Sequence, residues 1–563
     1  MKKIFNTILA VAASMALVTS CFNLDEEAFS EIVQESFTPS EQDVASLLAS
    51  AYTPLAFFFD WQGLFDALEE PADVVITPVR PNGWDDGGTY QRMHKHTWSA
   101  EEWQPWNIYE TGFTGINNCN RVIGQIEDGS LPVGDEQEAM IMELRDVRAL
   151  WYSILLDSHG NVPIVTAFTD EVPAYKTRQE VYDFVVSEFQ EVLNSGLMSK
   201  EKSSSSYTRL NHWTTEMALM RVYLNAEVYT GTAQYDKALA LAEDIINNGP
   251  YSLSATYSEN FEIDLGPSNT EVMFAIPYDQ TYDTGGHVFC QNAKWYPPVS
   301  KNYFGWSYQC WGGSCANPQF VNSYQEGDTR KELTWMYGPC ANSTEIVWTN
   351  LNYLPSLTSK PDAGKDKGKS MTSIDFGLRQ QKFEPDVDTD WNWNNDFPYF
   401  RLAEAYYTAA ECLLRLGQRE SDAVNYVNAV RSRVAPAMTA ADLKGDTKMV
   451  YGTLPWGSLT YEVWEECNAD HDWSSVVDAL EASQTPKSTA ADKEAVKFGG
   501  MYDEWGWEFA LEGLRRQQMI RFGTYTTKNW FNHTAIPDGH TALFPIPLDV
   551  LNTNANLKQN PGY

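Results

Sequence analysis

Two segments, far apart in the chain, carry the pattern of paired amphipathic helices. The first is EMALMRVYLNAEVYTGTAQYDKALALAEDIINNG (residues 216–249), and the second is RLAEAYYTAAECLLRLGQRESDAVNYVNAVRSR (residues 401–433). In each, apolar residues recur at spacings of three and four, which is typical of a helix with one buried face. A glycine, Gly231 or Gly417, interrupts each pattern midway and predicts a turn. These segments favour a helical scaffold, because apolar helix faces must be covered by other elements.

Residues 106–126, 136–158 and 179–193 show the same helical spacing. The two hairpins resemble tetratricopeptide repeats, whose small residues let two helices pack closely; ordinary helical hairpins are the alternative. Since the two are neither adjacent in the sequence nor strict copies, we expect a helical scaffold and not a regular solenoid. The predicted fold class is mainly α, with a tetratricopeptide-like hairpin scaffold, long aromatic-rich loops and minor short strands, such as EVMFAIP at residues 271–277.

Between the hairpins, residues 250–400 are rich in Gly, Pro, Asn, Ser and aromatic residues. Loops of this length inside a compact protein are usually functional or disordered, and the aromatic content argues against disorder. The segment 294–313 concentrates these rings, and flat rings on a stiffened loop suit stacking on a sugar. The alternative is that they form a small core beneath the loop. The candidate ligand-binding residues here are Trp295, Tyr296, Tyr303, Trp306, Tyr308 and Trp311.

A second aromatic stretch runs from residue 81 to residue 106. Trp84 stands between PNG and DDGG, which predicts a turn-rich tip, and we add it to the candidate sugar contacts. We expect Trp98, Trp103 and Trp106 to enter the core instead.

The first twenty residues have the composition of a targeting signal. Lys2 and Lys3 precede an apolar run that is too short to span a bilayer comfortably. A small residue directly before Cys21 resembles a bacterial lipobox, in which the cysteine is lipidated; a plain signal peptide is the alternative. We therefore predict a signal peptide at residues 1–20 and a lipid anchor at Cys21. The acidic run 25–27 behind the anchor resembles the export tag of surface-displayed lipoproteins.

The chain is strongly acidic, with a formal net charge of −36 at pH 7. A protein that binds nucleic acid needs a basic footprint for the phosphates, so nucleic acid is excluded as a partner. Polyanionic substrates would need a local basic patch. Neutral ligands fit this composition best, and the acidic charge keeps a surface protein soluble.

Two acidic patterns could carry chemistry. The segment EPDVDTDWNWNND (residues 384–396) places oxygen donors at alternate positions, which in part suits the binding of Ca²⁺. It lacks the glycine of a sharp turn and the terminal glutamate of a calcium loop. We therefore expect a solvated loop and no cofactor or metal site. Glu504, Glu508 and Glu512 share one helix face, and we interpret them as a structural ion-pair helix compensated by Arg515 and Arg516.

The cysteines and the search for catalytic motifs give no firm prediction of a site. Cys310 and Cys315 are close enough in sequence for a loop disulfide, which the sequence leaves open. No nucleophile elbow, HExxH motif or phosphate loop is present, so no catalytic residue is predicted.

Several segments, in order along the chain, resemble the SusD/RagB family. The closing segment LFPIPLDVLNTNANLKQNPGY (543–563) is similar to the family's C-terminal motif. EWGWEFALEGLRRQQMIRFG (504–523), FPYFRLAEAYYTAAECLLRLG (397–417), NSYQEGDTRKELTW (322–335) and ELRDVRALWYSILLDSHGNVPIV (143–165) resemble its internal motifs. The sequence departs from the family's motifs at two places. Residues 516–518 are Arg-Gln-Gln, which is not the usual sequence there, and His159 stands where tyrosine is commoner.

The resemblance implies a mainly α fold in which residues 21–270 form an N-terminal region and residues 271–563 a C-terminal region with ligand-binding loops. It implies a lipoprotein on the outer face of the outer membrane, with a SusC-like TonB-dependent transporter as partner and an oligosaccharide as ligand. A peptide ligand, or a role mainly as a transporter lid, are alternatives. A surface glycosidase is the alternative from another class.

Overall fold

A computed structural model describes residues 41–80, 85–281, 292–298, 300–336, 338–341, 347–353, 357–361, 370–372, 376–388, 394–454, 457–458, 479 and 485–563. Cys21 and Trp84 lie outside these residues. As predicted, the described part is mainly helical, with short strands. Its helices are α2 (Glu41–Tyr52), α3 (Leu64–Glu69), α4 (Thr89–Lys95), α5 (Trp103–Glu127), α6 (Gln137–Ser158), α7 (Arg178–Ser195), α8 (His212–Leu224), α9 (Ala226–Thr230), α10 (Tyr235–Asn248), α11 (Ser300–Phe304), α12 (Pro318–Val321), α13 (Arg330–Thr334), α14 (Leu402–Leu416), α15 (Glu420–Arg431), α16 (Ala440–Lys444), α19 (Gly499–Phe509), α20 (Arg515–Arg521) and α21 (Leu548–Thr553).

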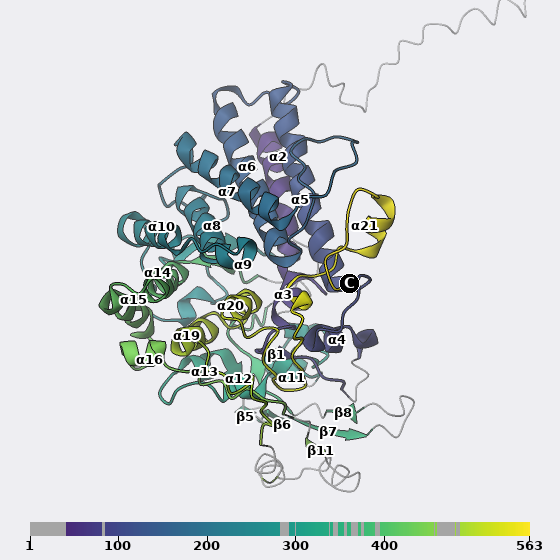
Figure 1. Ribbon diagram of the computed structural model, residues 1–563, viewed down its shortest axis with the longest axis vertical. Coiled ribbons are helices and arrows are strands. Elements are labelled where there is room, and N and C mark those ends of the chain that lie inside the picture. The colour runs from purple at the N-terminus through teal and green to yellow at the C-terminus, as the bar shows by residue number, and fades with distance from the viewer. Residues whose placement is uncertain are drawn as a thin grey trace, which may run out of the picture.

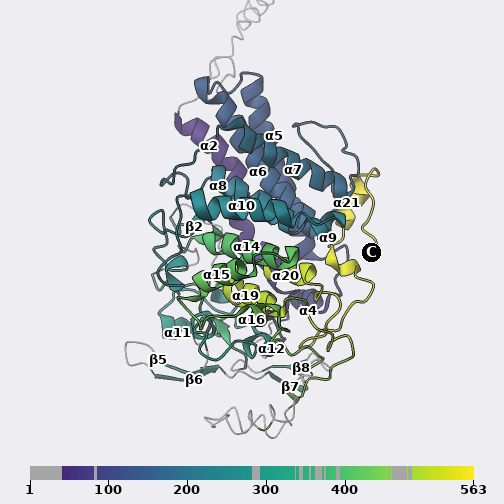
Figure 2. The same cartoon turned by 60° about the vertical axis from the view of Figure 1, so that its left-hand side comes forward.

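Helices that follow one another in the chain pack side by side in a continuous row (Figures 1 and 2). The row runs α5, α6, α7, α8, α10, α14, α15, with each helix against the next. Both predicted hairpins are confirmed, as α8 to α10 and as α14 to α15, and Gly231 and Gly417 end helices with φ of 76° and 66°. The hairpins are distant in sequence but stack in space, because α10 packs on α14.

Local sequence explains where several of these helices begin and how closely they pack. Asn211 caps α8 by accepting hydrogen bonds from the backbone N–H groups of Trp213 and Thr214. Gly115 lets α5 approach α6, because a Cβ at this position would lie 2.1 Å from Nε1 of Trp151. A side-chain cap therefore fixes the start of α8, and a glycine permits the close contact of α5 with α6.

The long insertion between the hairpins, residues 277–396, begins and ends at two neighbouring strands. β2 (Val272–Ile276) pairs antiparallel with β10 (Phe397–Arg401), with Phe397 opposite Ile276. The excursion carries α11, α12 and α13, which lie at the end of the molecule opposite the top of α2 and α6 (Figure 1). Its short strands are β3 (Cys315–Ala316), β4 (Trp335–Met336), β5 (Gly338–Ala341), β6 (Val347–Tyr353), β7 (Thr358–Pro361), β8 (Ser370–Met371) and β9 (Arg379–Gln380). β3 pairs with β1 (Val75–Ile76), β4 with β9, β5 with β6, and β7 with both β8 and β11 (Gly457–Ser458).

The C-terminal segment returns to the beginning of the fold. Nδ2 of Asn560 donates to the carbonyl oxygens of His159 and Phe544, each at 2.7 Å. Nε1 of Trp98 donates to the Tyr563 hydroxyl at 2.7 Å, which confirms that Trp98 enters the core. Residues on both sides of position 270 contribute to one hydrophobic core.

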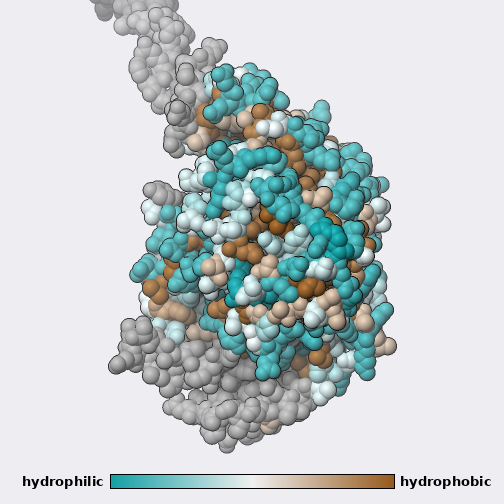
Figure 3. Space-filling view, turned by 90° about the vertical axis from the view of Figure 1, so that its left-hand side faces the viewer, coloured by the Kyte–Doolittle hydropathy of each residue, from teal (hydrophilic) through white to brown (hydrophobic). Residues whose placement is uncertain are grey.

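The surface over α10, α14 and α15 is mostly hydrophilic, with small scattered apolar areas (Figure 3). No helix among the described residues is long and apolar enough to cross a membrane.

Candidate functional site

The predicted aromatic loop folds inward instead of presenting all its rings to solvent. Trp295, Tyr296, Trp306 and Tyr308 are buried, whereas Tyr303 and Trp311 are half-buried. The loop turns back on itself at residue 312, where φ is +68° and a Cβ would lie 2.9 Å from Cα of Pro297, so glycine is required there. The structure thus favours, for four of the six rings, a small core beneath the loop.

Trp306 lies at the centre of this small core. Its ring stacks on Phe304, with the centroids 4.1 Å apart, and on Tyr308, with the centroids 5.2 Å apart. Its Nε1 donates to the carbonyl oxygen of Asp386 at 2.6 Å. With two rings stacked on it and its N–H bonded, Trp306 has no face for a sugar, and the expectation of an exposed stacking face is wrong for it. Trp295 and Tyr308 are buried as well, so the expectation of an exposed stacking face is wrong for them too. Burying rings against one another removes more apolar area from water than exposing them singly.

The outer edge of the small core opens into a cleft of about 690 Å³, which we call the aromatic cleft. Its apolar wall is formed by Phe261, Tyr296, Tyr303, Phe304, Leu333, Met336 and Pro385. Its polar wall is formed by Ser258, Glu262, Asp264, Glu332, Gln381, Lys382 and Glu384. The ring of Tyr303 stands edge-on to that of Phe304 at 4.7 Å, and both are half-buried. Two of the six predicted loop residues, Tyr296 and Tyr303, therefore line one cleft.

Charge in the aromatic cleft is predominantly negative. Burial, followed by the charges of Asp264 and Glu384, raises the pKa of Glu262. Among the described residues that line the cleft, Lys382 is the one cation. Its Nζ donates to the Glu508 and Ala510 carbonyl oxygens, at 3.0 and 2.8 Å, and burial lowers its pKa to about 8.

Since Lys382 is bonded inward, the described lining offers a ligand aromatic surface, carboxylate acceptors, and the hydroxyl and amide groups of Ser258 and Gln381. Sugar hydroxyls can donate to such acceptors, and the apolar face of a pyranose can pack on such rings. An anionic ligand would meet like charge here.

Three tryptophans that are not in the predicted loop are partly exposed. Trp103 is 58% exposed, so its predicted place in the core is wrong; it is the first residue of α5 and points away from the helix row's core. Trp106 is half-buried beside it, with Nε1 donating to Oδ2 of Asp549 at 2.8 Å, above a shallow recess of about 470 Å³. Trp61 is 50% exposed and its Nε1 lies 3.3 Å from Oδ2 of Asp86.

The acidic residues of the segment 504–512 form a buried network. Glu504 and Glu508 are fully buried on α19, and Glu512 follows the end of that helix. Oε atoms of Glu508 lie 3.2 Å from Arg330, 3.2 Å from Arg401 and 2.8 Å from Arg433. The interpretation as structural ion pairs is confirmed, because these side chains pair with buried arginines.

The source of the compensating charge differs from the prediction. Arg515 pairs with Asp73 at 2.7 Å, and Arg516 pairs with Asp157 at 3.0 Å. The guanidinium groups that face α19 come from α13, β10 and α15 and from the residues just after α15. Sequence proximity within one turn did not decide the pairing, since tertiary packing brought more distant arginines closer.

Two further sequence features were a candidate disulfide between Cys310 and Cys315 and a candidate calcium loop at residues 384–396. Cys310 and Cys315 are free and buried, so the loop disulfide is not formed. In the oxygen-rich segment, Asp386 accepts hydrogen bonds from the Asp388 backbone N–H at 2.9 Å and from Nδ2 of Asn394 at 2.6 Å. Residues 390 and 392 of this segment lie outside the described residues.

The fold and the cleft together define a mainly α protein in which a row of helix pairs supports a long insertion with an aromatic-lined recess. A sequence profile of the SusD family matches residues 270–563, more than half of the chain, and the chain belongs to this family. The starch-binding protein SusD of Bacteroides thetaiotaomicron is 24% identical over 539 residues, which cover 89% of this chain and 85% of that protein.

Solved structures share the fold over nearly the whole chain. A SusD superfamily protein from Parabacteroides distasonis superposes with a TM-score of 0.66 at 17% identity, covering 94% of this chain and 100% of that one. Surface glycan-binding protein A from Bacteroides thetaiotaomicron, in complex with laminarihexaose, superposes with a TM-score of 0.64 at 18% identity, covering 93% and 100%. These likenesses establish the SusD-like architecture.

Proposed function

We propose that this protein is a non-catalytic, cell-surface glycan-binding lipoprotein that captures a neutral oligosaccharide and delivers it to a SusC-like TonB-dependent transporter. Membership of the SusD family supports it, as do relatives whose names state starch binding and surface glycan binding. The lipobox-like sequence at Cys21 supports lipid anchoring in the outer membrane, and the acidic residues behind it support display toward the exterior.

The observation that carries the ligand class is the composition of the aromatic cleft. Tyr303 and Phe304 offer half-buried rings, and the carboxylates of Glu262, Asp264 and Glu384 stand around them as acceptors. Carbohydrates expose both apolar ring faces and many hydroxyl donors, so a neutral glycan matches this lining. Trp84, Tyr296 and Trp311 remain proposed contacts of the same ligand.

The absence of catalysis is part of the proposal. A glycosidase needs two carboxylates that flank the bond, about 5 to 10 Å apart and open to substrate. Glu504 and Glu508, which share one helix face, are fully buried and bonded to arginines, and this arrangement supports a structural role for these two residues.

Native affinity electrophoresis tests the ligand class. Residues 22–563 would be run through gels that each contain one neutral or acidic polysaccharide, and retardation in a neutral glycan gel is the expected result. Titration calorimetry with the matching oligosaccharide would then compare Tyr303→Ala with a control, Phe168→Ala, whose ring is 67% exposed outside the cleft.

Loss of one stacking ring should weaken binding about tenfold in Tyr303→Ala, whereas Phe168→Ala should bind as the unmodified chain does. Equal affinity of the two variants would contradict the cleft as the site. Retardation in no gel would refute the glycan proposal and point to a peptide ligand or a lid, which co-purification with the transporter would then distinguish. Release of reducing sugar by the unmodified chain, abolished in a Glu508→Gln variant that circular dichroism shows to be folded, would revive the glycosidase.

A further inference from the structure

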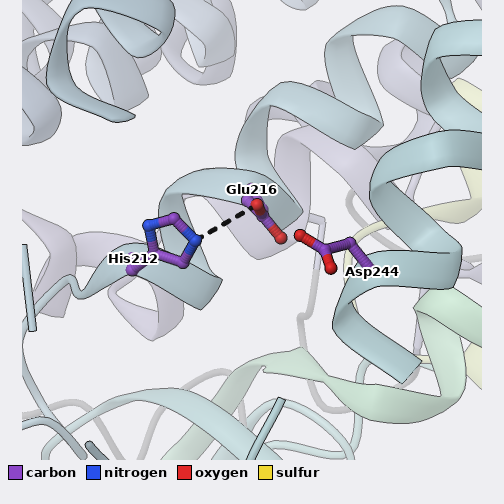
Figure 4. Close-up of side chains that lie close together, drawn as sticks. All are labelled: His212, Glu216 and Asp244. Atoms are coloured by element: carbon purple, nitrogen blue, oxygen red, sulfur yellow. Dashed lines mark ion pairs between the residues drawn. The ribbon is translucent and has the colours of Figure 1, made fainter. Parts of the chain in front are cut away.

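A group of one histidine and two carboxylates lies between the two helices of the first hairpin, and none of its residues lines the aromatic cleft. His212 and Glu216 stand one turn apart on α8, and Asp244 faces them from α10 (Figure 4). One donor atom of each residue lies within 4.8 Å of the others. Nε2 of His212 is 3.2 Å from Oε1 of Glu216.

The second carboxylate oxygen of Glu216 has no hydrogen-bond donor in this group. Glu216 is 5% exposed, and its Oε2 has no hydrogen-bond donor among the described residues. Figure 4 shows that the carboxylates of Glu216 and Asp244 point at each other, so two groups of acceptors converge.

The surroundings hold the donors in place without satisfying them. Nδ2 of Asn248 donates to Oδ1 of Asp244. One oxygen of the Asp244 carboxylate is directed at Glu216 (Figure 4). The Lys200 ammonium contributes positive charge from the preceding loop, and its Nζ lies 5.6 Å from the centre of the Trp213 ring. A single charge at that position offsets the two carboxylates only in part.

We propose that His212, Glu216 and Asp244 bind one Zn²⁺ ion that links α8 to α10. An imidazole with two carboxylates is a donor set typical of zinc, whereas Ca²⁺ and Mg²⁺ prefer oxygen donors alone. In a tetrahedral zinc site with bonds of about 2.0–2.1 Å, two donor atoms lie about 3.4 Å apart, close to the spacing of His212 and Glu216. Small side-chain rotations would bring Asp244 to the same distance, and water would complete the coordination. The ion and the two carboxylates together carry no net charge.

Metal titration of the untagged chain, residues 22–563, tests the site. After treatment with a chelator, isothermal titration with ZnCl₂ should give one tight site, and a Zn²⁺ concentration of 100 times Kd should raise Tm by about 2 °C. Asp244→Asn keeps the side-chain shape and should weaken Zn²⁺ binding at least tenfold, as should His212→Gln. His540→Gln is the matched control, because His540 pairs with Asp538 on an exposed turn, and it should bind Zn²⁺ as the unmodified chain does.

Far-UV circular dichroism and gel filtration would establish that each variant folds, and Co²⁺ would replace Zn²⁺ as a spectroscopic probe. A visible absorption band of tetrahedral Co²⁺ that disappears in His212→Gln would support an imidazole ligand. The proposal is overturned if the unmodified chain takes up no Zn²⁺ stoichiometrically. It is equally overturned if Asp244→Asn retains full affinity, or if CaCl₂ binds as tightly as ZnCl₂.

Discussion

Replacing Glu508 with glutamine should destabilise the fold without changing its shape. The carboxylate is fully buried and paired with Arg330, Arg401 and Arg433. The charges of these groups outweigh burial, which acts in the opposite direction, and hold the pKa of Glu508 at about 2, below its ordinary value of 4.5. Glutamine fills the same space but cannot compensate three buried guanidinium groups.

The magnitude follows from the pKa difference. Each pKa unit corresponds to about 1.4 kcal/mol, so the depression from 4.5 to about 2 represents roughly 3 kcal/mol of stability at neutral pH. Losses on breaking buried ion pairs, about 3–5 kcal/mol, agree with this value. For a chain of this size the unfolding entropy is about 1 kcal/mol per kelvin, so Tm should fall by roughly 3 °C.

Urea denaturation and differential scanning fluorimetry at pH 7 would measure the loss, with Glu191→Gln as the control. Glu191 is 59% exposed and pairs with Arg145 at the surface, so its substitution should cost less than about 0.5 kcal/mol. Because the folded-state pKa of Glu508 is depressed, its contribution is complete above pH 4.5 and is lost as the pH falls toward 2. The difference between Glu508→Gln and the unmodified chain should shrink over that window. Equal stability of both proteins at pH 7 would refute the reasoning.

Three separate parts of the chain give predictions that can be checked independently. Gly115→Ala should destabilise the fold by about 3 kcal/mol or more, since its Cβ would overlap Trp151, whereas Gly124→Ala in the same helix meets nothing within 4 Å and should raise stability by up to about 1 kcal/mol; thermal unfolding of both variants would check this. Burial raises the pKa of Cys310 to about 12, so peptide mass spectrometry should find it unmodified by iodoacetamide at pH 8 until the chain unfolds. Cys21→Ser should move the protein from the membrane fraction to the soluble fraction, as immunoblotting of fractionated cells would show.

Helical elements could be predicted closely because their signals are local. Apolar spacing and the glycine at each turn are enough to locate α8 to α10 and α14 to α15. That Trp98 lies inside and Trp103 outside could not be derived in this way, since both belong to the same aromatic-rich stretch. The half-exposed Trp61 was missed, although Asp60 and the turn at Gln62, with φ of 56°, bracket it.

Candidate sites depended on contacts between residues that are distant in sequence. The rings of the loop 294–313 made it a candidate site, but the stack around Trp306 decided which of them face the cleft. His212 and Glu216 stand four residues apart, a spacing that is common on any helix and carries no signal until Asp244 on α10 is placed opposite them. For that reason the sequence predicted no metal site at these three residues.

By itself, the sequence determined the family, the helical class, the hairpins and the acidic character that favours a neutral ligand, because each of these depends on residue types and short-range spacing. Only the tertiary structure decided which rings are core and which line the aromatic cleft. It also decided which arginines neutralise Glu504 and Glu508, and which carboxylates meet His212. The burial of a ring and the pairing of a charged group both depend on how α10, α14, α19 and the long insertion pack. Such contacts form between segments that are tens to hundreds of residues apart in the chain, so short-range spacing in the sequence does not reveal them.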